Sequence, residues 1–312
     1  MSDAARRRVP RRAARPLGAA AGIALDRLVP EPPAAVHPVV LFGLVMTSVE
    51  RRLHRDRRGA GLVHAAAGLA LGLAAGAAIR STALATTSAV AGRALGRAGH
   101  DVGRALDAGD LERARALLPA LVGRDPAGLD EGEVARAAVE SVAENTVDAV
   151  VAPALWAAAA GAPGALGYRA VNTLDSMVGH RTTRYANYGW ASARLDDVVA
   201  WVPARLTAVL VALVRPTAAR AVWRAVRTQA PAHPSPNAGV AEAAFAAALG
   251  VRLGGRNRYG GWTEDRGALG DGRATQAGDI DAAVRLSRDV SAALATALTV
   301  VGCVGWWWGR RP

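Results

Sequence analysis

The sequence predicts an all-α, polytopic integral membrane protein, and three observations support this fold class. Hydrophobic residues make up 51% of the 312 residues and aromatic residues only 4%, a composition typical of helices rich in alanine, leucine and valine. Several uncharged runs approach the roughly 20 residues that a helix needs to cross a bilayer. The net charge of +12 agrees with this class, because basic residues gather at membrane edges.

The basic residues themselves exclude several kinds of nucleotide site. All 38 of them are arginine, so the chain lacks the P-loop lysine, the pyridoxal Schiff base and the phosphate-binding lysine of kinases. The single cysteine, Cys303, excludes a disulfide framework and a cysteine-based zinc site. A strongly basic chain is also typical of nucleic-acid binding, but the long apolar runs favour a lipid bilayer as the partner. We therefore expect no nucleic-acid partner and a multi-pass location in the inner, or plasma, membrane.

The chain begins with a basic tail over residues 1–16, which carries six arginines, and residues 17–312 are expected to form a single membrane domain. We expect about five membrane spans. The clearest are residues 60–79, where only His64 interrupts the apolar run, and residues 290–308, which hold no charge.

The remaining predicted spans are irregular. Residues 147–167 contain Pro153 and Pro163, and residues 198–214 contain Pro203, so both are expected to be broken or kinked. The short apolar runs at 17–29 and 36–49 predict either one bent span or a re-entrant pair.

A soluble helical insertion is expected at about 93–146. Between residues 101 and 148 eleven acidic residues face five arginines, whereas the rest of the chain is strongly basic. Apolar residues recur at helical spacing at 111–122 and 131–148. The proline- and glycine-rich stretches at 231–239 and 254–272 are expected to be loops.

Three carboxylates recur every four residues at the end of this insertion: Glu140, Glu144 and Asp148. On a helix they share one face, with Asn145 beside them. One interpretation is a solvated acidic face. The other is a Mg²⁺ site at the membrane boundary, where a divalent cation relieves the mutual repulsion and ionisable groups are usually functional.

The segment 172–197 is the richest in polar and charged side chains. It offers acid/base groups, donors for phosphate or carboxylate groups and aromatic surfaces, although a hydrogen-bonded loop between helices explains it equally well. The residues in question are Asn172, Asp175, His180, Arg181, Arg184, Tyr185, Asn187, Tyr188, Arg194, Asp196 and Asp197.

Two further segments are candidates for binding anions. The sequence HPSPNAG at 233–239 places His233, Ser235 and Asn237 before an alanine-rich run, which predicts either an N-cap turn or an anion site at a helix N-terminus. A glycine-rich basic loop follows at 254–261, and its backbone amides could hold phosphate through Gly254, Gly255 and Asn257.

Several motifs, taken in order, resemble the CobD/CbiB family of adenosylcobinamide-phosphate synthases over about residues 22–290. They include HPV at 37–39, ESVAENTVDAVVAP at 140–153, AVNTLDSMVGH at 170–180, GWASARLDD at 189–197, HPSPNAG at 233–239 and EAAFAAALGVRLGG at 242–255. The chain departs from the family at Pro30 and Glu31, where Gly-Asp is common, and at His180, where Tyr or Phe is common, so neither position is expected to be essential.

The resemblance implies a cobalamin-biosynthesis ligase that uses ATP to join (R)-1-aminopropan-2-ol, or its O-phosphate, to a carboxylate of the corrinoid substrate adenosylcobyric acid. It further implies Mg²⁺, the lipid bilayer and other cobalamin-assembly membrane enzymes as partners. A non-catalytic membrane regulator of the same superfamily and a transporter are the alternatives.

This chemistry leads to an assignment of roles within the motifs. Mg²⁺ is assigned to Glu140, Glu144 and Asp148, and catalysis to Glu140, Glu144, Asp175, Asp196 and Asp197. Substrate and phosphate binding is assigned to Asn145, Asn172, Arg181, Arg184, Arg194, His233, Ser235, Asn237, Gly254, Gly255 and Asn257.

Overall fold

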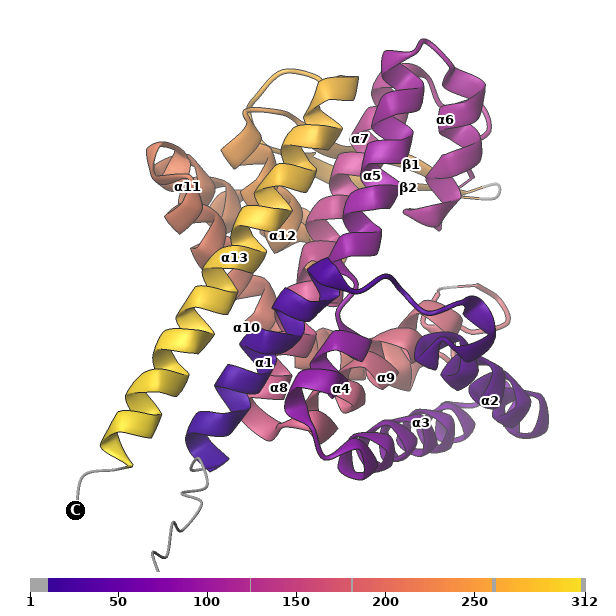
Figure 1. Cartoon of the computed structure of the whole chain (residues 1–312). Helices are drawn as coiled ribbons and strands as arrows, with labels where there is room; N and C mark the ends of the chain where they lie inside the picture. Colours follow the sequence, from indigo (N-terminus) through magenta and orange to yellow (C-terminus); the bar gives the residue numbers. More distant parts are fainter. Residues whose placement is uncertain (1–10, 124, 181, 260–261, 310–312) are drawn as a thin grey trace, which may run out of the picture.

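The computed structural model describes residues 11–123, 125–180, 182–259 and 262–309, and within them it is mainly helical (Figure 1). Short 3-10 turns join several of the helices. The main elements are α1 (Arg11–Leu28), α2 (Pro38–Leu53), α3 (Arg58–Ile79), α4 (Thr82–Ala89), α5 (Gly92–Asp107), α6 (Leu111–Leu117), α7 (Glu131–Thr146), a π-helical turn (Val147–Val151), α8 (Ala152–Ala160), α9 (Ala162–Val178), α10 (Trp190–Val214), α11 (Ala219–Thr228), α12 (Ala238–Leu249), β1 (Leu253–Tyr259), β2 (Trp262–Leu269) and α13 (Ala277–Trp308).

Three helices among the described residues are long and apolar enough to cross a membrane, namely α3, α10 and α13. They contain the predicted runs at 60–79, 198–214 and 290–308, so the polytopic helical fold is confirmed. About five spans were expected. The difference arises because the runs at 17–49 lie in α1, which has charged ends, and in the 16-residue α2, while the run at 147–167 is divided between shorter helices.

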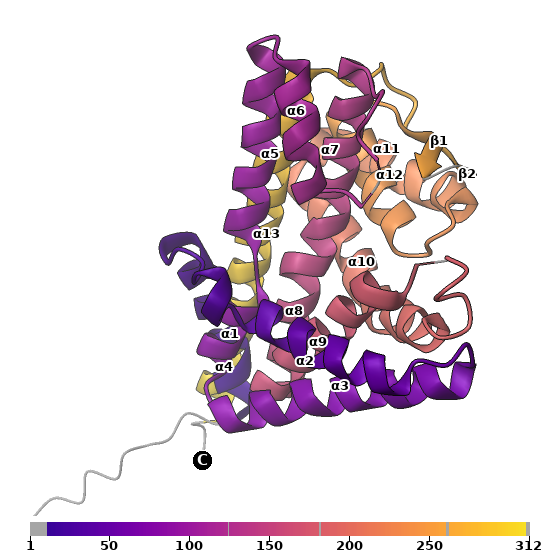
Figure 2. The ribbon, with the colours of Figure 1, turned by 90° about the vertical axis from the view of Figure 1, so that its right-hand side faces the viewer.

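Large apolar side chains are exposed on these helices, as expected where a protein faces lipid. Val300 and Val304 are about half exposed on α13, and Val202 and Leu213 are exposed on α10. Figures 1 and 2 show α1 beside α13 at one end of the molecule, with α5 continuing along α13 beyond α1. Figure 2 also shows α2 and α3 crosswise to α13.

Glycine allows α3 and α9 to approach closely. Gly68, Gly72 and Gly76 follow one another at four-residue spacing on the face of α3 that meets α9. A Cβ atom at Gly72 would lie 2.7 Å from the carbonyl oxygen of Leu166, and one at Gly76 would lie 2.4 Å from that of Ala162. Small residues at this spacing are a common way of packing helices in membranes, where dispersion contacts drive association.

Two prolines each leave one backbone carbonyl oxygen within a helix without its helical N–H partner. In each case a residue of another element donates a hydrogen bond to that oxygen. Pro153 has no N–H for the carbonyl of Ala149, and that oxygen accepts a hydrogen bond from the Ala91 N–H at 2.9 Å. Pro203 likewise leaves the carbonyl of Val199 to accept the indole N–H of Trp156 at 3.0 Å. The run 147–167 is broken, as expected, but the break lies at Gly161, where φ is +72°, and at Pro153 the helical path continues through the π-turn into α8.

The predicted insertion at 93–146 is helical and consists of α5, α6 and α7. A capping box starts α7, because Asp130 accepts the Glu133 N–H and Glu133 accepts the Asp130 N–H. Small residues lie on several faces of α7, which lets α5, α12 and α13 pack around it. α1 begins at Arg11, within the predicted basic tail 1–16, and residues 1–10 lie outside the described residues.

The hairpin of β1 and β2 is the main departure from the all-α prediction, which placed a loop at 254–272. The strands pair antiparallel, with Leu253 opposite Leu269 and a register shift between Gly254 and Arg256. Both Gly254 and Gly267 have a φ near +70°, which suits glycine. A Cβ atom at Gly254 would also lie 2.1 Å from the carbonyl oxygen of Gly267, so the strands come this close only because residue 254 has no side chain.

Candidate active site

Carboxylates from four parts of the fold converge on one region beside α7. Glu144 comes from the last turn of α7, Asp148 from the π-turn and Asp175 from α9. Asp196 and Asp197 come from the first half of α10. Asp148 lies near enough to Glu144 and Asp175 to be repelled by both, and Asp196 is close to Asp148 and Asp175. The structure thus brings together five of the predicted acidic residues.

Burial and mutual repulsion oppose ionisation of this group. Burial first, and the neighbouring Glu144 second, raise the pKa of Asp148 to about 7. Burial also raises the pKa of Asp175 to about 6, with His180 acting in the opposite direction. The pKa of Glu144 is raised for the same main reason, although the positive charge of Arg266 lowers it. A site in this state binds protons or cations readily.

Polar side chains of α9 hold the carboxylates in place. The hydroxyl of Tyr168 donates to Oδ1 of Asp148 at 3.2 Å. The amide of Asn172 donates to Oδ1 of Asp196 at 3.5 Å and accepts from Arg169 at 3.4 Å. Sequence reasoning missed Tyr168 and Arg169. The signal was available, since Tyr168, Asn172 and Asp175 are spaced to share one face of a helix.

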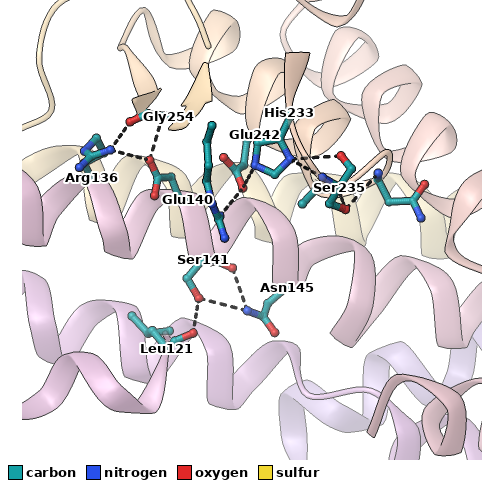
Figure 3. A network of polar contacts seen from close by, with 12 residues as sticks. Leu121, Arg136, Glu140, Ser141, Asn145, His233, Ser235, Glu242 and Gly254 are labelled. Atoms are coloured by element: carbon teal, nitrogen blue, oxygen red, sulfur yellow. Dashed lines mark hydrogen bonds and ion pairs between the residues drawn. The ribbon is translucent and has the colours of Figure 1, made fainter. Parts of the chain in front are cut away.

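Glu140 is buried and belongs to a different contact (Figure 3). Its Oε1 accepts the backbone N–H of Gly254 at 2.9 Å and lies 3.5 Å from Nη1 of Arg136. Arg136 also donates to the carbonyl oxygen of Gly254. Glu140 therefore joins α7 to β1, while its charge still adds to the raised pKa of Glu144.

The segment HPSPNAG forms the turn that leads into α12, and Figure 3 shows His233 and Glu242 pointing toward each other. Nδ1 of His233 lies 3.1 Å from both the backbone nitrogen and the carbonyl oxygen of Ser235, and Nε2 lies 3.7 Å from Oε1 of the fully buried Glu242. Arg266 of β2 lies 3.8 Å from the same oxygen. Arg266, which the sequence analysis did not select, thus connects Glu242 with Glu144.

The same turn is fixed to α10 beside the carboxylates. The hydroxyl of Ser235 accepts the N–H groups of Asn237 and Ala238, whereas Asn237, the N-cap residue of α12, makes no side-chain capping bond. The amide of Asn237 donates to the carbonyl oxygen of Asp197 at 2.8 Å and accepts from Arg205 at 2.7 Å. Arg194 lies 3.6 Å from a carboxylate oxygen of Asp197.

Comparison with known proteins agrees with this arrangement of motifs. The family model described as "CobD/Cbib protein" matches residues 19–287. The chain belongs to the CobD/CbiB family. Proteins named "Cobalamin biosynthesis protein CobD" are 49% identical in Mycobacterium tuberculosis, covering 90% of this chain and 94% of the relative, and 45% identical in Geobacter metallireducens, covering 80% and 84%. A third relative of that name, in Halalkalibacterium halodurans, is 40% identical over 84% of this chain and 88% of its own. No solved structure matches the chain.

Other predicted site residues of this CobD/CbiB protein lie apart from the carboxylates or form hydrogen bonds and ion pairs elsewhere in the structure. Asn145 donates to Ser141, whose hydroxyl bonds the carbonyl oxygen of Leu121 (Figure 3). Arg184 forms an ion pair of 3.0 Å with Glu50 at the end of α2. Arg181 and the side chain of Asn257 lie outside the described residues, and Gly255 has a φ of +81° in β1.

The chemistry of the cluster in this CobD/CbiB protein suits Mg²⁺, although the three predicted ligands do not form a ready-made cage. Among the described residues, no three His, Cys, Asp or Glu side chains are grouped closely enough to hold one ion. Mg²⁺ is usually bound by one or two carboxylates together with waters and substrate phosphates. Glu144 and Asp148 meet that requirement, because they are oxygen donors in adjacent turns that repel each other.

Proposed function

We propose that this member of the CobD/CbiB family is the ATP-dependent ligase of cobalamin biosynthesis that joins (R)-1-aminopropan-2-ol, or its O-phosphate, to a carboxylate of adenosylcobyric acid. The observation that carries the proposal is the convergence of Glu144, Asp148, Asp175 and Asp196 from four parts of the fold. A purely structural role does not explain such a group, because buried carboxylates that repel one another destabilise the native state.

The reaction needs activation, because a carboxylate and an amine do not condense in water. A carboxylate oxygen of the corrinoid attacks the γ-phosphorus of ATP, the bond to ADP breaks, and an acyl phosphate forms. The amine then attacks the acyl carbon, inorganic phosphate leaves, and the amine loses a proton as the amide forms. Bound Mg²⁺ would neutralise the phosphate charge during the transfer.

Within this proposal the residues divide into two groups. Glu144 and Asp148 would hold Mg²⁺, and Asp175 or Asp196 accepts the proton that the amine loses, a role that suits Asp175 because burial raises its pKa to about 6. Arg194 binds phosphate from the start of α10. Glu140, Gly254, His233, Ser235 and Asn237 act as positioning residues through the contacts that join α7, α10, α12 and the hairpin.

Mass spectrometry of the corrinoid product tests the proposal. Membranes carrying the protein are incubated with adenosylcobyric acid, Mg²⁺, ATP and either the amino alcohol or its phosphate. We expect the corrinoid to gain the mass of one amine molecule less one water, with one of the two amines and only when ATP is present. The substrate that reacts also decides whether the amine is phosphorylated.

Variants separate catalysis from folding. Glu144→Gln and Asp148→Asn should each lower the rate by roughly two orders of magnitude or more, since metal and transition-state contacts contribute at least that much. Glu131→Gln is the matched control, because Glu131 is exposed in the first turn of the same helix. If no combination of substrates gives a product, the ligase function is contradicted, and the membrane regulator and the transporter remain as alternatives. If both variants keep full activity, the assignment of Glu144 and Asp148 to the active site is contradicted.

A further inference from the structure

A second charged cavity lies between α1, α5 and α13. It measures about 460 Å³ and is separate from the carboxylate cluster. Val142 lines it, whereas Glu140 and Glu144, two residues away on either side, point to the opposite side of α7. The proposed ligase reaction uses none of the residues that form this cavity.

Positive charge dominates the cavity wall. Four arginines line it together with one carboxylate: Arg27, Arg93, Arg97, Arg288 and Asp26. Asp26 is buried, and its Oδ2 accepts the backbone N–H of Arg93 at 3.0 Å at the start of α5. Within the described part of the chain, no carboxylate lies within 4.0 Å of any of the four guanidinium groups.

Hydrogen bonds to uncharged groups orient three of these arginines. Arg27 donates to the carbonyl oxygen of Arg288 at 2.8 Å, and Arg93 donates to that of Leu28 at 3.1 Å. Arg288 lies 3.1 Å from Nε2 of His100, whose Nδ1 lies 2.5 Å from Asp281. A guanidinium group has five N–H donors, so each arginine keeps donors for a ligand.

The cavity lies where two apolar helical segments end. On α13 it is lined by Val284, Ser287, Arg288 and Ser291, directly at the start of the uncharged run 290–308. On α1, Arg27 follows the apolar stretch 17–25. The rest of the lining includes Ile23, Val90 and Val150. The cavity therefore combines a cationic rim with apolar walls at the expected edge of the hydrocarbon region.

We propose that this cavity binds a phosphate group at the membrane surface. Guanidinium groups bind phosphate oxygens through paired, charge-assisted hydrogen bonds. Basic pockets between membrane helices bind the head groups of anionic lipids, and the apolar walls suit an attached acyl chain. A water-borne phosphate ester has the same chemistry at the rim but makes no use of the apolar walls.

Native mass spectrometry of the purified full chain tests the lipid source. Delipidated protein is titrated with phosphatidylglycerol, and with phosphatidylcholine as the zwitterionic comparison. The variant Arg97→Gln is the cleanest test, because the side chain of Arg97 makes no hydrogen bond or ion pair with any described residue, and we expect its loss to leave the fold undisturbed. Arg285→Gln is the control, since Arg285 is exposed one turn before Arg288 on α13 and does not line the cavity.

A thermal-shift measurement with inorganic phosphate, against chloride at equal ionic strength, tests the water-borne source. We expect Arg97→Gln to bind phosphatidylglycerol roughly fivefold more weakly than the unmodified chain, and Arg97→Gln with Arg288→Gln more weakly again, with Arg285→Gln unchanged. If inorganic phosphate stabilises the unmodified chain and Arg285→Gln but not the cavity variants, the phosphate site is supported and its ligand is a soluble one. Equal responses of the cavity variants and the unmodified chain in both arms, or an equal loss in Arg285→Gln, would overturn the proposal.

Discussion

The hydroxyl of Tyr168 donates a hydrogen bond to Oδ1 of Asp148 across 3.2 Å, so α9 directly stabilises the ionised carboxylate of the π-turn. This contact lowers the pKa of Asp148, against burial and the charge of Glu144, which raise it. Removing the hydroxyl should therefore make Asp148 harder to ionise. The pH dependence of ligation reports this directly.

In Tyr168→Phe we expect the acid limb of the rate profile to move upward by about one pH unit, because hydrogen bonds to the charged form shift a pKa by that order. Tyr185→Phe is the matched control. Its hydroxyl donates to Glu50 at 3.0 Å, so the substitution removes a tyrosine contact without touching the cluster. An unchanged profile in Tyr168→Phe would contradict a role for ionised Asp148 in the rate.

The raised pKa of Asp148 also predicts how stability depends on pH. The pKa of this carboxyl group is ordinarily 3.8 and is about 7 in the folded chain. The contribution of Asp148 to the free energy of unfolding is therefore fully present below about pH 4 and is lost as the pH rises through 7. Without divalent cations, Asp148→Asn should therefore exceed the unmodified protein in Tm at pH 8. The gain in unfolding free energy is expected to be roughly 1–3 kcal/mol.

This difference in Tm should shrink toward pH 5, where Asp148 is already protonated. Added Mg²⁺ should stabilise the unmodified protein at pH 8 more than Asp148→Asn. A difference that is independent of pH would show that the substitution acts through packing. Asp101→Asn, at an exposed ion pair with Arg104 on α5, is the control for the change in net charge.

Packing between α3 and α9 predicts that one methyl group at Gly72 is costly. The Cβ of Gly72→Ala would lie 2.6 Å from the Cβ of Ala170 and 2.7 Å from the Leu166 carbonyl oxygen, so the helices must move apart. We expect a loss of about 1–3 kcal/mol in unfolding free energy. Gly59→Ala on the same helix meets nothing within 4 Å and should be neutral or slightly stabilising. Equal Tm values for the two variants would refute this close approach.

The contact of Arg136 with Glu140 and Gly254 predicts how the hairpin is held. Arg136→Met leaves the carboxylate of Glu140 buried with one partner fewer, which is expected to cost about 3 kcal/mol and to loosen β1 from α7. Limited proteolysis within residues 253–269 should become faster. Arg252→Met is the control, because Arg252 is exposed beside the hairpin. Cleavage at the same rate in both variants would show that α7 does not hold the hairpin.

The sequence predicted the helical membrane fold and selected the acidic residues that lie near one another in the structure, because both depend on local patterns. The uncharged runs identify α3, α10 and α13, and the four-residue spacing places Glu144 and Asp148 on neighbouring turns. Asp175 and Asp196 were selected from the density of polar residues alone. Their meeting with Asp148 depends on how α9 and α10 fold back on α7, which a single sequence does not encode locally.

The errors have specific physical causes. Glu140 follows the same spacing as Glu144, but a partner 114 positions away, Gly254, accounts for its orientation. Pro153 looked like a helix breaker, yet Ala91 supplies the missing hydrogen-bond partner and the path continues. The hairpin was missed although Gly260 and Gly261 lie between two polar runs, because a glycine pair is common both in hairpin turns and in loops.

The length of α13 fixes a dimension of the whole molecule. Its 32 residues give about 48 Å of continuous helix, whereas the hydrocarbon layer is about 30 Å thick. The first third therefore stands outside the lipid, and α5, α7 and α12 pack along it. α7, whose last turn carries Glu144, packs along this part of α13, so the membrane-spanning part of α13 would set the height of that turn above the bilayer. A water-soluble reactant and a membrane-associated one would then meet the same residues without any change in the depth of the protein.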